Sequence, residues 1–396
     1  MKVETISHES GDLLPLLLDD DDLPIPAPNE YVMSRRYLSH NTLTRNLREL
    51  SVLYKWLHSN DINLSERLSS KYIFSEAEIK GSLVEALRRD QGSQRKIKKI
   101  VITPNTFNQR LTTVRKYLGW CFDVELGCMP YTDSKFEQVR ENKKRILHWL
   151  ESAFMNTPPT NKGLRKGLNN LETEFLLSIL DPSATVSFGR DPAVRFRNYI
   201  MTTIMLFYGL RPGELLKLKV EDIEIGALSC IRVTRKPPDK NDTRKANPQI
   251  KRNGRVLPID NPVFAKNLDL YITEWRDVLE ERSDRNSEYL ILSDEGDPLS
   301  QSSITHFFQR LRKKYPSKLP LHLTAKSLRH TFSYQMERNL REGGIGEQKR
   351  SEILAMLRGD SSLDSQLIYI AQEVEEQARA ALKKYQQNLI IEDVPW

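Results

Sequence analysis

The feature that most restricts the fold of this chain is a strongly apolar stretch near its middle, DPAVRFRNYIMTTIMLFYGL, at residues 191–210. A run of this character predicts a buried helix, either in the core of a globular domain or in a membrane. No part of the chain approaches the roughly 20 consecutive apolar residues that cross a bilayer. We therefore expect a buried helix at the centre of a globular domain.

Two segments closer to the N-terminus have the spacing of amphipathic helices. Between residues 41 and 57, apolar side chains follow one another at intervals of four, three, four and three, and a similar stripe follows Thr103 and Pro104. A third helix is expected over about 133–155. The first half of the chain is therefore expected to be all-helical. The stripes are formed by Leu43, Leu47, Leu50, Tyr54 and Leu57, and by Phe107, Leu111, Val114 and Leu118.

Shifts in composition divide the chain into five parts. An acidic run and the aperiodic LPIPAPNE indicate a flexible N-terminal lead-in, and NTPPTNKGLRKGLNN indicates a linker. SCIRVTR and GRVLPI have the β-branched content of short strands. The expected fold class is mainly α with a small antiparallel β-sheet, with a helical domain followed by an α+β domain. The parts are the lead-in (1–30), the helical domain (31–156), the linker (157–170), the second domain (171–387) and an apolar C-terminal tail (388–396).

Charge and cysteine content limit the classes of function. The chain has 60 Lys and Arg against 53 Asp and Glu, a formal net charge of +7. Its basic residues gather in four clusters, which favours a polyanion as partner over a set of solvated faces. Three cysteines without a CxxC pattern exclude a disulfide framework and a structural zinc, and suit a reducing cytosol. The basic clusters lie at Arg95–Lys99, Lys143–Arg145, Lys236–Arg255 and Arg312–Lys318.

The stretch that follows the apolar helix, GLRPGEL at residues 209–215, places Arg211 at a helix N-terminus. Gly209 is placed to end the preceding helix, and Pro212 suits the first turn of the next one. Backbone N–H groups and the helix dipole favour an anion at such a position. Glu214 can orient the guanidinium of Arg211, which could then bind a phosphate through two parallel hydrogen bonds. Taken alone, an ordinary buried ion pair is the simpler interpretation.

A second stretch, TAKSLRHTF at residues 324–332, brings three cationic or polar side chains to the start of a helix. Thr324 is expected to cap this helix, and its apolar residues form a buried stripe. Lys326, Arg329 and His330 project from another face, with no acidic residue between them to relieve their repulsion. Such a grouping of donors is unusual for a face that is merely solvated.

A third stretch, LRGDSSLDSQLIY, occupies residues 357–369. Gly359 fits the end of one helix, and one of the serines after it fits the cap of the next. Tyr369 lies late in the second of these helices, next to an isoleucine on each side. Alone, a tyrosine in this setting indicates core packing.

In this order and at this spacing, the three stretches resemble the catalytic domain of the tyrosine recombinases, the phage integrase family of site-specific DNA recombinases. The resemblance covers roughly residues 171–385, and the segment 31–155 is similar, with fewer matching features, to the core-binding domain of that family. The G-L-R-x-x-E-L element of the family is matched by residues 209–215, the His-x-x-Arg element by residues 328–331, and the element that ends in the nucleophilic tyrosine by residues 359–369.

The resemblance implies a catalytic set. Tyr369 would attack a DNA phosphodiester and form a 3′-phosphotyrosyl link, while Arg211, Arg329 and Lys326 would bind the non-bridging oxygens. No metal and no other cofactor is implied, because cationic side chains supply the charge stabilisation. Tyr385 is the next candidate for the nucleophile.

The general acid of the family is a lysine on a β-hairpin, shortly before an Arg-x-x-Pro strand. Here that strand begins at Arg255, and Lys251, four residues earlier, is our choice. Lys240 and Lys245 are alternatives, because the hairpin carries a long insertion.

Two positions depart from the family pattern. Lys326 stands where the family has the histidine of His-x-x-Arg, and it can still donate to a phosphate oxygen. Asp360 stands where the family has a histidine or tryptophan. Because its carboxylate would repel a phosphate, we expect Asp360 to point away or to bond a neighbouring cation. His330 is a supporting residue that would compensate for the change.

The resemblance implies a site-specific recombinase or integrase that acts on double-stranded DNA as a homotetramer, without a membrane or a small-molecule substrate. The expected location is cytoplasmic and nucleoid-associated, and the long hairpin and altered site favour a mobile-element branch of the family. The apolar tail is expected to pack on its own domain or on a neighbouring protomer. Three other functions are compatible with the sequence: a non-catalytic DNA-binding accessory protein, a type IB topoisomerase and a basic RNA-binding protein.

Overall fold

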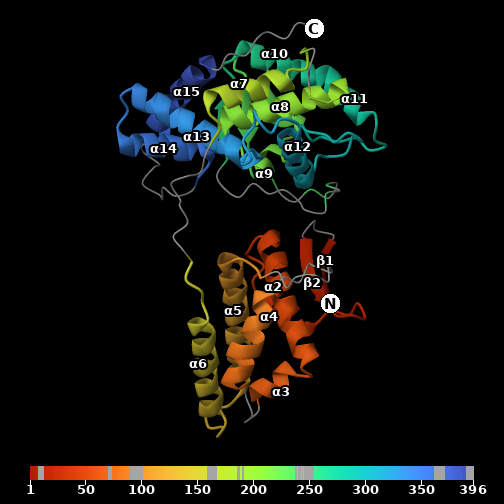
Figure 1. Cartoon of the computed structure of the whole chain (residues 1–396), viewed down its shortest axis with the longest axis vertical. Helices are drawn as coiled ribbons and strands as arrows, with labels where there is room; N and C mark the ends of the chain where they lie inside the picture. The colour runs from red at the N-terminus through yellow and green to blue at the C-terminus, as the bar shows by residue number, and fades with distance from the viewer. Residues whose placement is uncertain are drawn as a thin grey trace. The chain divides into compact units, whose positions relative to one another are not determined.

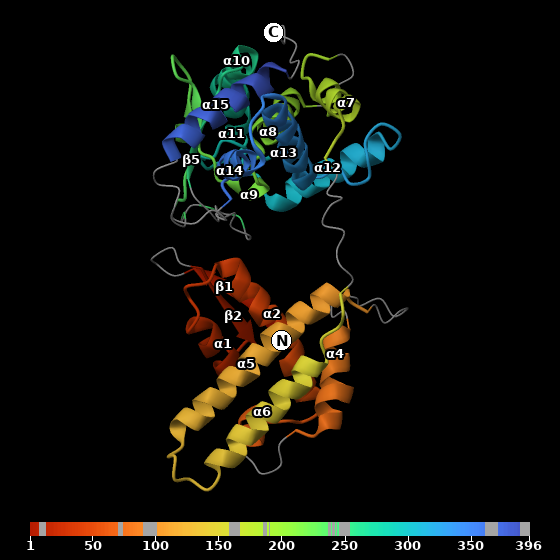
Figure 2. The same cartoon turned by 90° about the vertical axis from the view of Figure 1, so that its left-hand side faces the viewer.

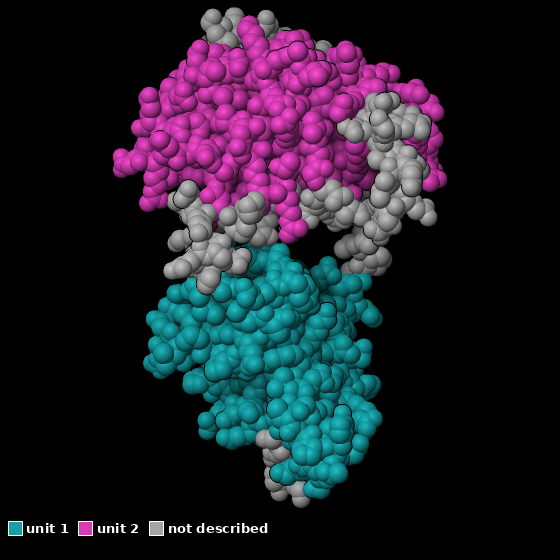
Figure 3. Space-filling view, turned by 180° about the vertical axis from the view of Figure 1, so that it is seen from behind, with its two compact units in different colours: residues 1–161 teal, residues 162–396 magenta. Residues whose placement is uncertain are grey.

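The chain forms two compact units, Met1–Asn161 and Lys162–Trp396 (Figure 1, Figure 3). The boundary between them falls within the stretch predicted as a linker. We describe each unit separately. The computed structural model describes residues 1–7, 13–69, 74–89, 101–157, 167–184, 188–189, 191–236, 239, 242, 244, 254–360 and 371–388, with the backbone alone for 371–377.

The N-terminal unit is a helical bundle with a β-hairpin on one side. The amphipathic stripes predicted from the sequence lie in α2 and α5, which begin at the side-chain caps Ser39 and Thr103 and contact each other. Helices α5 and α6 run side by side (Figure 2). The elements are β1 (Lys2–Ser7), β2 (Leu13–Leu18), α1 (Pro26–Met33), α2 (His40–Ser59), α3 (Leu64–Ser69), the π-helix η1 (Ala77–Leu83), α4 (Val84–Arg88), α5 (Pro104–Cys128) and α6 (Phe136–Ser152).

The hairpin corrects the prediction for residues 1–30. Strand β1 pairs with β2 in an antiparallel register from Lys2 opposite Leu18 to Ser7 opposite Leu13, and α1 begins at Pro26. Leu17 is fully buried in the core of this unit, and β2 contacts α2. A flexible lead-in was therefore the wrong prediction, and so was an all-helical first half. The physical reason is that Leu17 and Leu18 of β2 are buried and that β2 contacts α2.

The C-terminal unit is built around α8, the apolar helix predicted from the sequence. All of its residues except Pro192 and Arg195 are buried, which confirms the prediction. Helices α7 and α13 contact it. The elements are α7 (Asn170–Leu180), α8 (Pro192–Tyr208), α9 (Pro212–Leu215), the 3-10 helix η2 (Val220–Asp222), β3 (Ile223–Glu224), β4 (Cys230–Val233), β5 (Arg255–Pro258), α10 (Pro262–Leu270), the π-helix η3 (Tyr271–Trp275), α11 (Arg276–Glu280), α12 (Gln301–Lys314), α13 (Ala325–Glu342), α14 (Glu347–Arg358) and α15 (Ala371–Gln387).

A small sheet completes this unit. Its order is β3, β4, β5, all antiparallel, with Val233 opposite Arg255. Both strands predicted from the sequence are present, and the fold class, mainly α with small antiparallel sheets, is confirmed. Within the described part of the chain, no helix combines the length and the apolar character needed to cross a bilayer.

The connection between α8 and α9 depends on Gly209. This residue ends α8 in the left-handed region, with φ of +59°. A Cβ atom here would fall on the ring of Phe332 in α13, 2.8 Å from its Cγ. Only glycine meets both conditions, and the backbone at the end of α8 therefore lies directly against α13.

Helix α15 packs on its own domain. Its residues Ala378, Leu382 and Tyr385 are buried in the core of the C-terminal unit. The Tyr385 hydroxyl donates to the carbonyl of Leu206 at 2.8 Å. Gln386 is fully buried and its side-chain oxygen accepts from the backbone N–H of Asp260. The domain body thus extends at least to Gln386.

Candidate active site

The first site residue, Arg211, lies at the N-cap of α9, as predicted. Glu214 accepts hydrogen bonds from the backbone N–H of Arg211 at 2.9 Å and from its Nη1 at 2.8 Å. The Arg211 side chain is 27% exposed, whereas that of Glu214 is 1% exposed. The buried carboxylate thus holds a partly exposed guanidinium in one orientation.

Glu214 has a second cationic partner that the sequence did not place in the site. Arg255, the first residue of β5, donates from Nη2 to Glu214 at 2.9 Å. Burial raises the pKa of Glu214, but Arg255 and Arg211 lower it, and the net result is a pKa below its ordinary value. Glu214 is therefore ionised at neutral pH and joins the sheet to α9.

Arg329 reaches the same place from α13. Thr324 caps this helix by accepting from the N–H of Ser327, as predicted. Arg329 donates from Nη1 to the carbonyl of Gly209 at 2.7 Å and from Nη2 to the carbonyl of Arg358 at 2.9 Å. Arg211 donates from Nη1 to that same Arg358 carbonyl at 3.1 Å. The last residue of α14 thus binds two guanidiniums from different segments.

Asp360 completes the cluster. One of its oxygens, Oδ1, accepts from Nη2 of Arg211 and from Nη2 of Arg329, the latter at 3.2 Å. The other, Oδ2, lies 3.2 Å from Nε of Arg358. Of the two arrangements expected for Asp360, the structure shows the one in which its carboxylate bonds neighbouring cations.

The three guanidiniums around Asp360 repel one another. Burial lowers the pKa of Arg329, the neighbouring Arg211 and Arg358 lower it further, and the result is about 9. This is still well above neutral pH, so Arg329 remains charged. A site of this composition needs an anion, and here the described side chains supply one in Asp360.

Lys326, on the predicted face of α13, does not take part in this cluster of hydrogen bonds. Lys326 is exposed and has no ion pair among the residues that the structure describes, and His330 is half-buried. The structure therefore brings together Arg211, Arg329, Glu214 and Asp360, but not Lys326. Its role as a phosphate ligand stays a prediction.

The predicted nucleophile and general acid lie outside the described residues. This holds for Tyr369 and for all three hairpin lysines, Lys240, Lys245 and Lys251. A further hairpin lysine that we had not considered, Lys236, is described. Its Nζ donates to the carboxylates of Glu221 and Asp222 in η2, at 2.7 and 2.9 Å.

Tyr385, the alternative nucleophile, is described and is unsuited to the role. Its side chain is 2% exposed and its ring stands at 89° to that of Phe332, with centroids 5.5 Å apart. Burial raises the pKa of Tyr385 well above its ordinary range. A hydroxyl that is buried, bonded to a backbone carbonyl and hard to ionise cannot reach a DNA phosphate.

The inserted hairpin is anchored by a buried ionic cluster at Asp242. This carboxylate accepts from Lys217 Nζ at 3.1 Å and from Arg244 Nε at 2.7 Å. The Arg244 guanidinium also lies 4.4 Å from the centroid of the Tyr289 ring. Although burial raises the pKa of Asp242, its two cationic partners lower it to about 2. These contacts fix part of the hairpin on the domain body.

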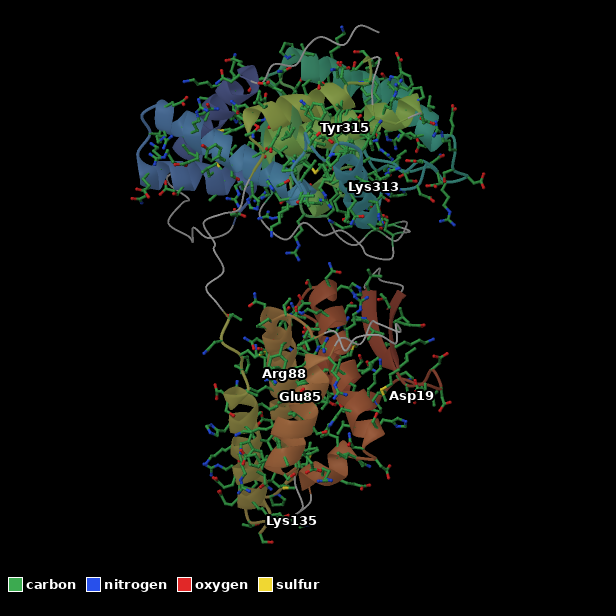
Figure 4. All side chains as sticks on the ribbon, in the orientation of Figure 1. Asp19, Glu85, Arg88, Lys135, Lys313 and Tyr315 are labelled. Carbon is green, nitrogen blue, oxygen red and sulfur yellow. The ribbon has the colours of Figure 1, made fainter. Side chains whose placement is uncertain are left out.

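The basic clusters that predicted a polyanion partner are partly neutralised. On α6, Lys143 and Lys144 each pair with a nearby carboxylate. Near the end of α12, Lys313 is exposed (Figure 4). The cluster at 95–99 lies outside the described residues, as does most of the cluster at 236–255.

Two arginines of the site, Arg255 and Arg358, were missed by the sequence reasoning. Arg255 was used only to locate the Arg-x-x-Pro strand, although a charged residue at the start of a buried strand is a signal for a buried partner. Arg358, next to Gly359, looks like a cation placed to interact with the helix dipole. Nothing in the sequence shows that Gly359 turns the chain so that Asp360 faces three arginines.

The arrangement is suited to binding a phosphate. Planar guanidiniums on separate helices converge on one small anion, and charge-assisted hydrogen bonds of this kind stabilise negative charge in a transition state. The backbone carbonyls of Gly209 and Arg358 fix the direction of the donors before any substrate arrives. The described residues thus present a set of donors that can bind an anion such as a phosphate.

Part of the C-terminal unit matches a known protein family. The model of the phage integrase family matches residues 171–341. Tyrosine recombinase XerA of Thermococcus kodakarensis is 26% identical over 299 residues, which cover 71% of this chain and 89% of XerA. Tyrosine recombinase XerC of Bacillus licheniformis is 26% identical over 228 residues, or 57% of this chain and 64% of XerC.

Among solved structures, the Tn1549 transposon integrase in complex with circular intermediate DNA aligns with 18% identity and a TM-score of 0.48. The alignment covers 89% of this chain and 98% of that one. The family match and the two curated relatives support what the three motifs predicted: residues 171–341 form a phage integrase family domain, as in the tyrosine recombinases, which are site-specific DNA strand transferases.

Proposed function

We propose that this chain cleaves and rejoins DNA strands at a specific site, with Tyr369 as the nucleophile. The observation that carries the proposal is the convergence of Arg211 and Arg329, from α9 and α13, on one carbonyl and one carboxylate oxygen. Because both guanidiniums reach one carboxylate oxygen, they can also reach the non-bridging oxygens of a single phosphodiester. The family match over this part of the chain supports the same reaction.

The reaction is a pair of transesterifications. The phenol oxygen of Tyr369 attacks phosphorus, the bond to the 5′ oxygen of the deoxyribose breaks, and a 3′-phosphotyrosyl link remains. Arg211 and Arg329 stabilise the charge of the pentavalent phosphorane, and Lys326 adds a further donor. A hairpin lysine, Lys251 in our proposal, protonates the leaving oxygen. Since the covalent link conserves bond energy, a second 5′-hydroxyl can reverse the step and join a new strand.

The first test replaces Tyr369 by Phe. The variant should form no covalent protein–DNA adduct and should bind DNA almost as the parental chain does, because only one hydroxyl is lost. Cells expressing each protein are lysed in denaturant, the chain is recovered, and attached DNA is sequenced. The mapped site is then built into a nicked suicide substrate, on which adducts accumulate.

Two matched controls isolate the nucleophile. Tyr334→Phe changes an exposed tyrosine of α13, 68% exposed, and should leave adducts unchanged. Tyr385→Phe removes a buried hydroxyl and should also leave them, because that hydroxyl bonds Leu206. Adducts that persist in Tyr369→Phe would refute the assignment.

One observation favours a second function, a non-catalytic DNA-binding accessory protein. Asp360 already fills the space between Arg211 and Arg329 that a phosphate would need. An accessory protein would bind DNA and give no adduct with any substrate, whereas the recombinase gives adducts that depend on Tyr369. Relaxation of supercoiled DNA at many unrelated sequences would instead indicate a topoisomerase.

We further propose that the active form is a homotetramer on double-stranded DNA, associated with the nucleoid, and that the apolar tail docks on a neighbouring protomer. Because Gln386 is buried in its own domain, a deletion that tests the tail must start later, at residue 389. Removal of 389–396 should reduce the fraction of tetrameric complexes in a native gel with the mapped site, and leave the melting temperature of the free chain unchanged. Normal tetramers from the shortened chain would refute the docking.

A further inference from the structure

The position of Asp360 is set by the backbone. Gly359 adopts φ of +62° at the end of α14. Its N–H donates to the carbonyl of Met356 at 2.9 Å, and the N–H of Asp360 donates to the carbonyl of Ala355 at 2.7 Å. These two bonds are the Schellman arrangement, which reverses the chain at a helix end. The carboxylate is thereby directed back over the last turn of α14, and its side chain is 19% exposed.

The carboxylate uses both oxygens as a phosphate would. Oδ1 bridges the two arginines already assigned to the phosphate, Arg211 and Arg329, and Oδ2 faces Arg358. Arg358 Nε is buried and makes no hydrogen bond in the described structure, although it lies 3.2 Å from that oxygen. Because the Nε–H of Arg358 faces the carboxylate without a well-directed hydrogen bond, an anion of another shape, such as a phosphate, could accept that bond.

The exposed fractions of the three arginine side chains also support binding of an external anion. The side chains of Arg211 and Arg358 are 27% and 29% exposed, whereas that of Arg329 is 7% exposed. An anion that enters from solvent therefore meets Arg211 and Arg358 first and Arg329 at the base. Asp360 lies between all three.

The exchange of anions is electrostatically balanced. A phosphodiester and a carboxylate each carry one negative charge, so the replacement of one by the other leaves the charge of the cluster unchanged. During the reaction the phosphorane gains a second negative charge, which the cations stabilise more than they stabilise a carboxylate. The described cluster consists of the guanidiniums of Arg211, Arg255, Arg329 and Arg358 and the carboxylates of Glu214 and Asp360.

We propose that Asp360 is an internal substitute for the scissile phosphate, and that Arg358 is a third phosphate-binding guanidinium, which becomes available when DNA displaces the carboxylate. The inference rests on the proposed function, since it identifies the anion as a DNA phosphate. It assigns two roles. Asp360 keeps Arg211, Arg329 and Arg358 oriented toward one point in the absence of DNA. Arg358 supplies the hydrogen-bond donor that the histidine or tryptophan of the family supplies at the position of residue 360.

The test uses inorganic phosphate and the full chain, in a chloride buffer, by isothermal titration. Asp360→Asn keeps the shape of the side chain and removes its charge, so phosphate no longer competes with an internal anion. We expect its affinity for phosphate to rise about tenfold, the order expected for one charge-assisted hydrogen bond. In the Asp360→Asn background, Arg358→Gln should lose most of that gain, and Arg358→Lys should retain part of it.

The control is Asp294→Asn. Asp294 pairs with Arg197 at 3.0 Å elsewhere in the unit, so this variant makes the same change in net charge. Its affinity for phosphate should stay within about twofold of the parental value, because long-range interactions between exposed charges are screened by salt. Circular dichroism establishes that each variant is folded, and Asp360→Ser takes the place of Asp360→Asn if the amide does not fold.

Two results would overturn the proposal. If the Asp360→Asn or Asp360→Ser variant binds phosphate no more tightly than the parental chain does, the carboxylate does not occupy the phosphate position. If Arg358→Gln changes nothing, Arg358 is not a ligand. Binding of inorganic phosphate requires neither Tyr369 nor target DNA. A negative titration would therefore not affect the adduct experiment, and a failure to detect adducts would not affect the titration.

Discussion

Replacement of Gly209 by Ala tests whether the close approach of α8 to α13 sets the stability of the C-terminal unit. The left-handed backbone, with φ of +59°, adds about 1–2 kcal/mol of strain for a residue with a Cβ. The new methyl group would also overlap the buried ring of Phe332, and overpacking of a core typically costs about 1–3 kcal/mol. The sum is a loss of about 2–5 kcal/mol in the free energy of unfolding.

The measurement is native-state hydrogen exchange on peptides from α8. These amides report the opening of this unit separately from the N-terminal unit, which contributes its own transition to any bulk unfolding curve. Gly344→Ala is the matched control: its φ is +75°, but a Cβ there meets nothing within 4 Å. It should therefore show the strain of about 1–2 kcal/mol alone.

The same variant has a functional consequence. Phe332 lies one turn after Arg329 on α13, and the carbonyl of Gly209 accepts from Arg329 at 2.7 Å. Displacement of the ring or of that carbonyl should therefore also lower the rate of adduct formation. If Gly209→Ala is no less stable than Gly344→Ala, the overlap with Phe332 does not determine the packing and the reasoning fails.

Two further predictions concern other contacts of the C-terminal unit. Thr331→Val leaves the buried N–H of Leu168, which donates to Thr331 Oγ1 at 2.7 Å, without an acceptor, and should destabilise the unit by about 1–3 kcal/mol in urea unfolding; a loss below about 0.5 kcal/mol would contradict it. The ionised form of Asp242 is favoured in the folded state, because its pKa of about 2 lies below the ordinary 3.8. Its contribution, of the order of 2 kcal/mol, should be present above about pH 4 and be lost as the pH falls toward 2. Urea midpoints of Asp242→Asn should therefore depend less on pH over this range than those of the parental chain, and parallel curves would count against the ion cluster.

Much of the C-terminal unit could be predicted because local rules and packing agree there. Gly209 ends a helix, Pro212 begins one and Thr324 caps one, and each does so for the reason that its side chain suggests. The contact between Arg211 and Glu214 also follows from spacing alone, since both lie in one helical turn. The convergence of distant segments came instead from the family resemblance.

The remaining features depend on tertiary contacts that no local pattern encodes. The strand LLPLLL lacks alternation and contains Pro15, and local rules disfavour proline inside a strand, but pairing with β1 and contact with α2 outweigh this local preference. The direction of Asp360 was equally open, because it depends on how α14 ends relative to Arg211 and Arg329. Both outcomes required knowledge of a neighbour far away in the sequence.

The carbonyl of Arg358, which binds two guanidiniums, makes the site sensitive to the length of α14. A backbone acceptor is present whatever side chain occupies residue 358, so substitutions there leave this contact available. An insertion or deletion of one residue within α14 would rotate the helix end by about 100° and carry the acceptor away from both arginines. Among natural variants of this protein, changes in the identity of exposed α14 residues should therefore be common, whereas changes in the number of α14 residues should coincide with loss of strand exchange.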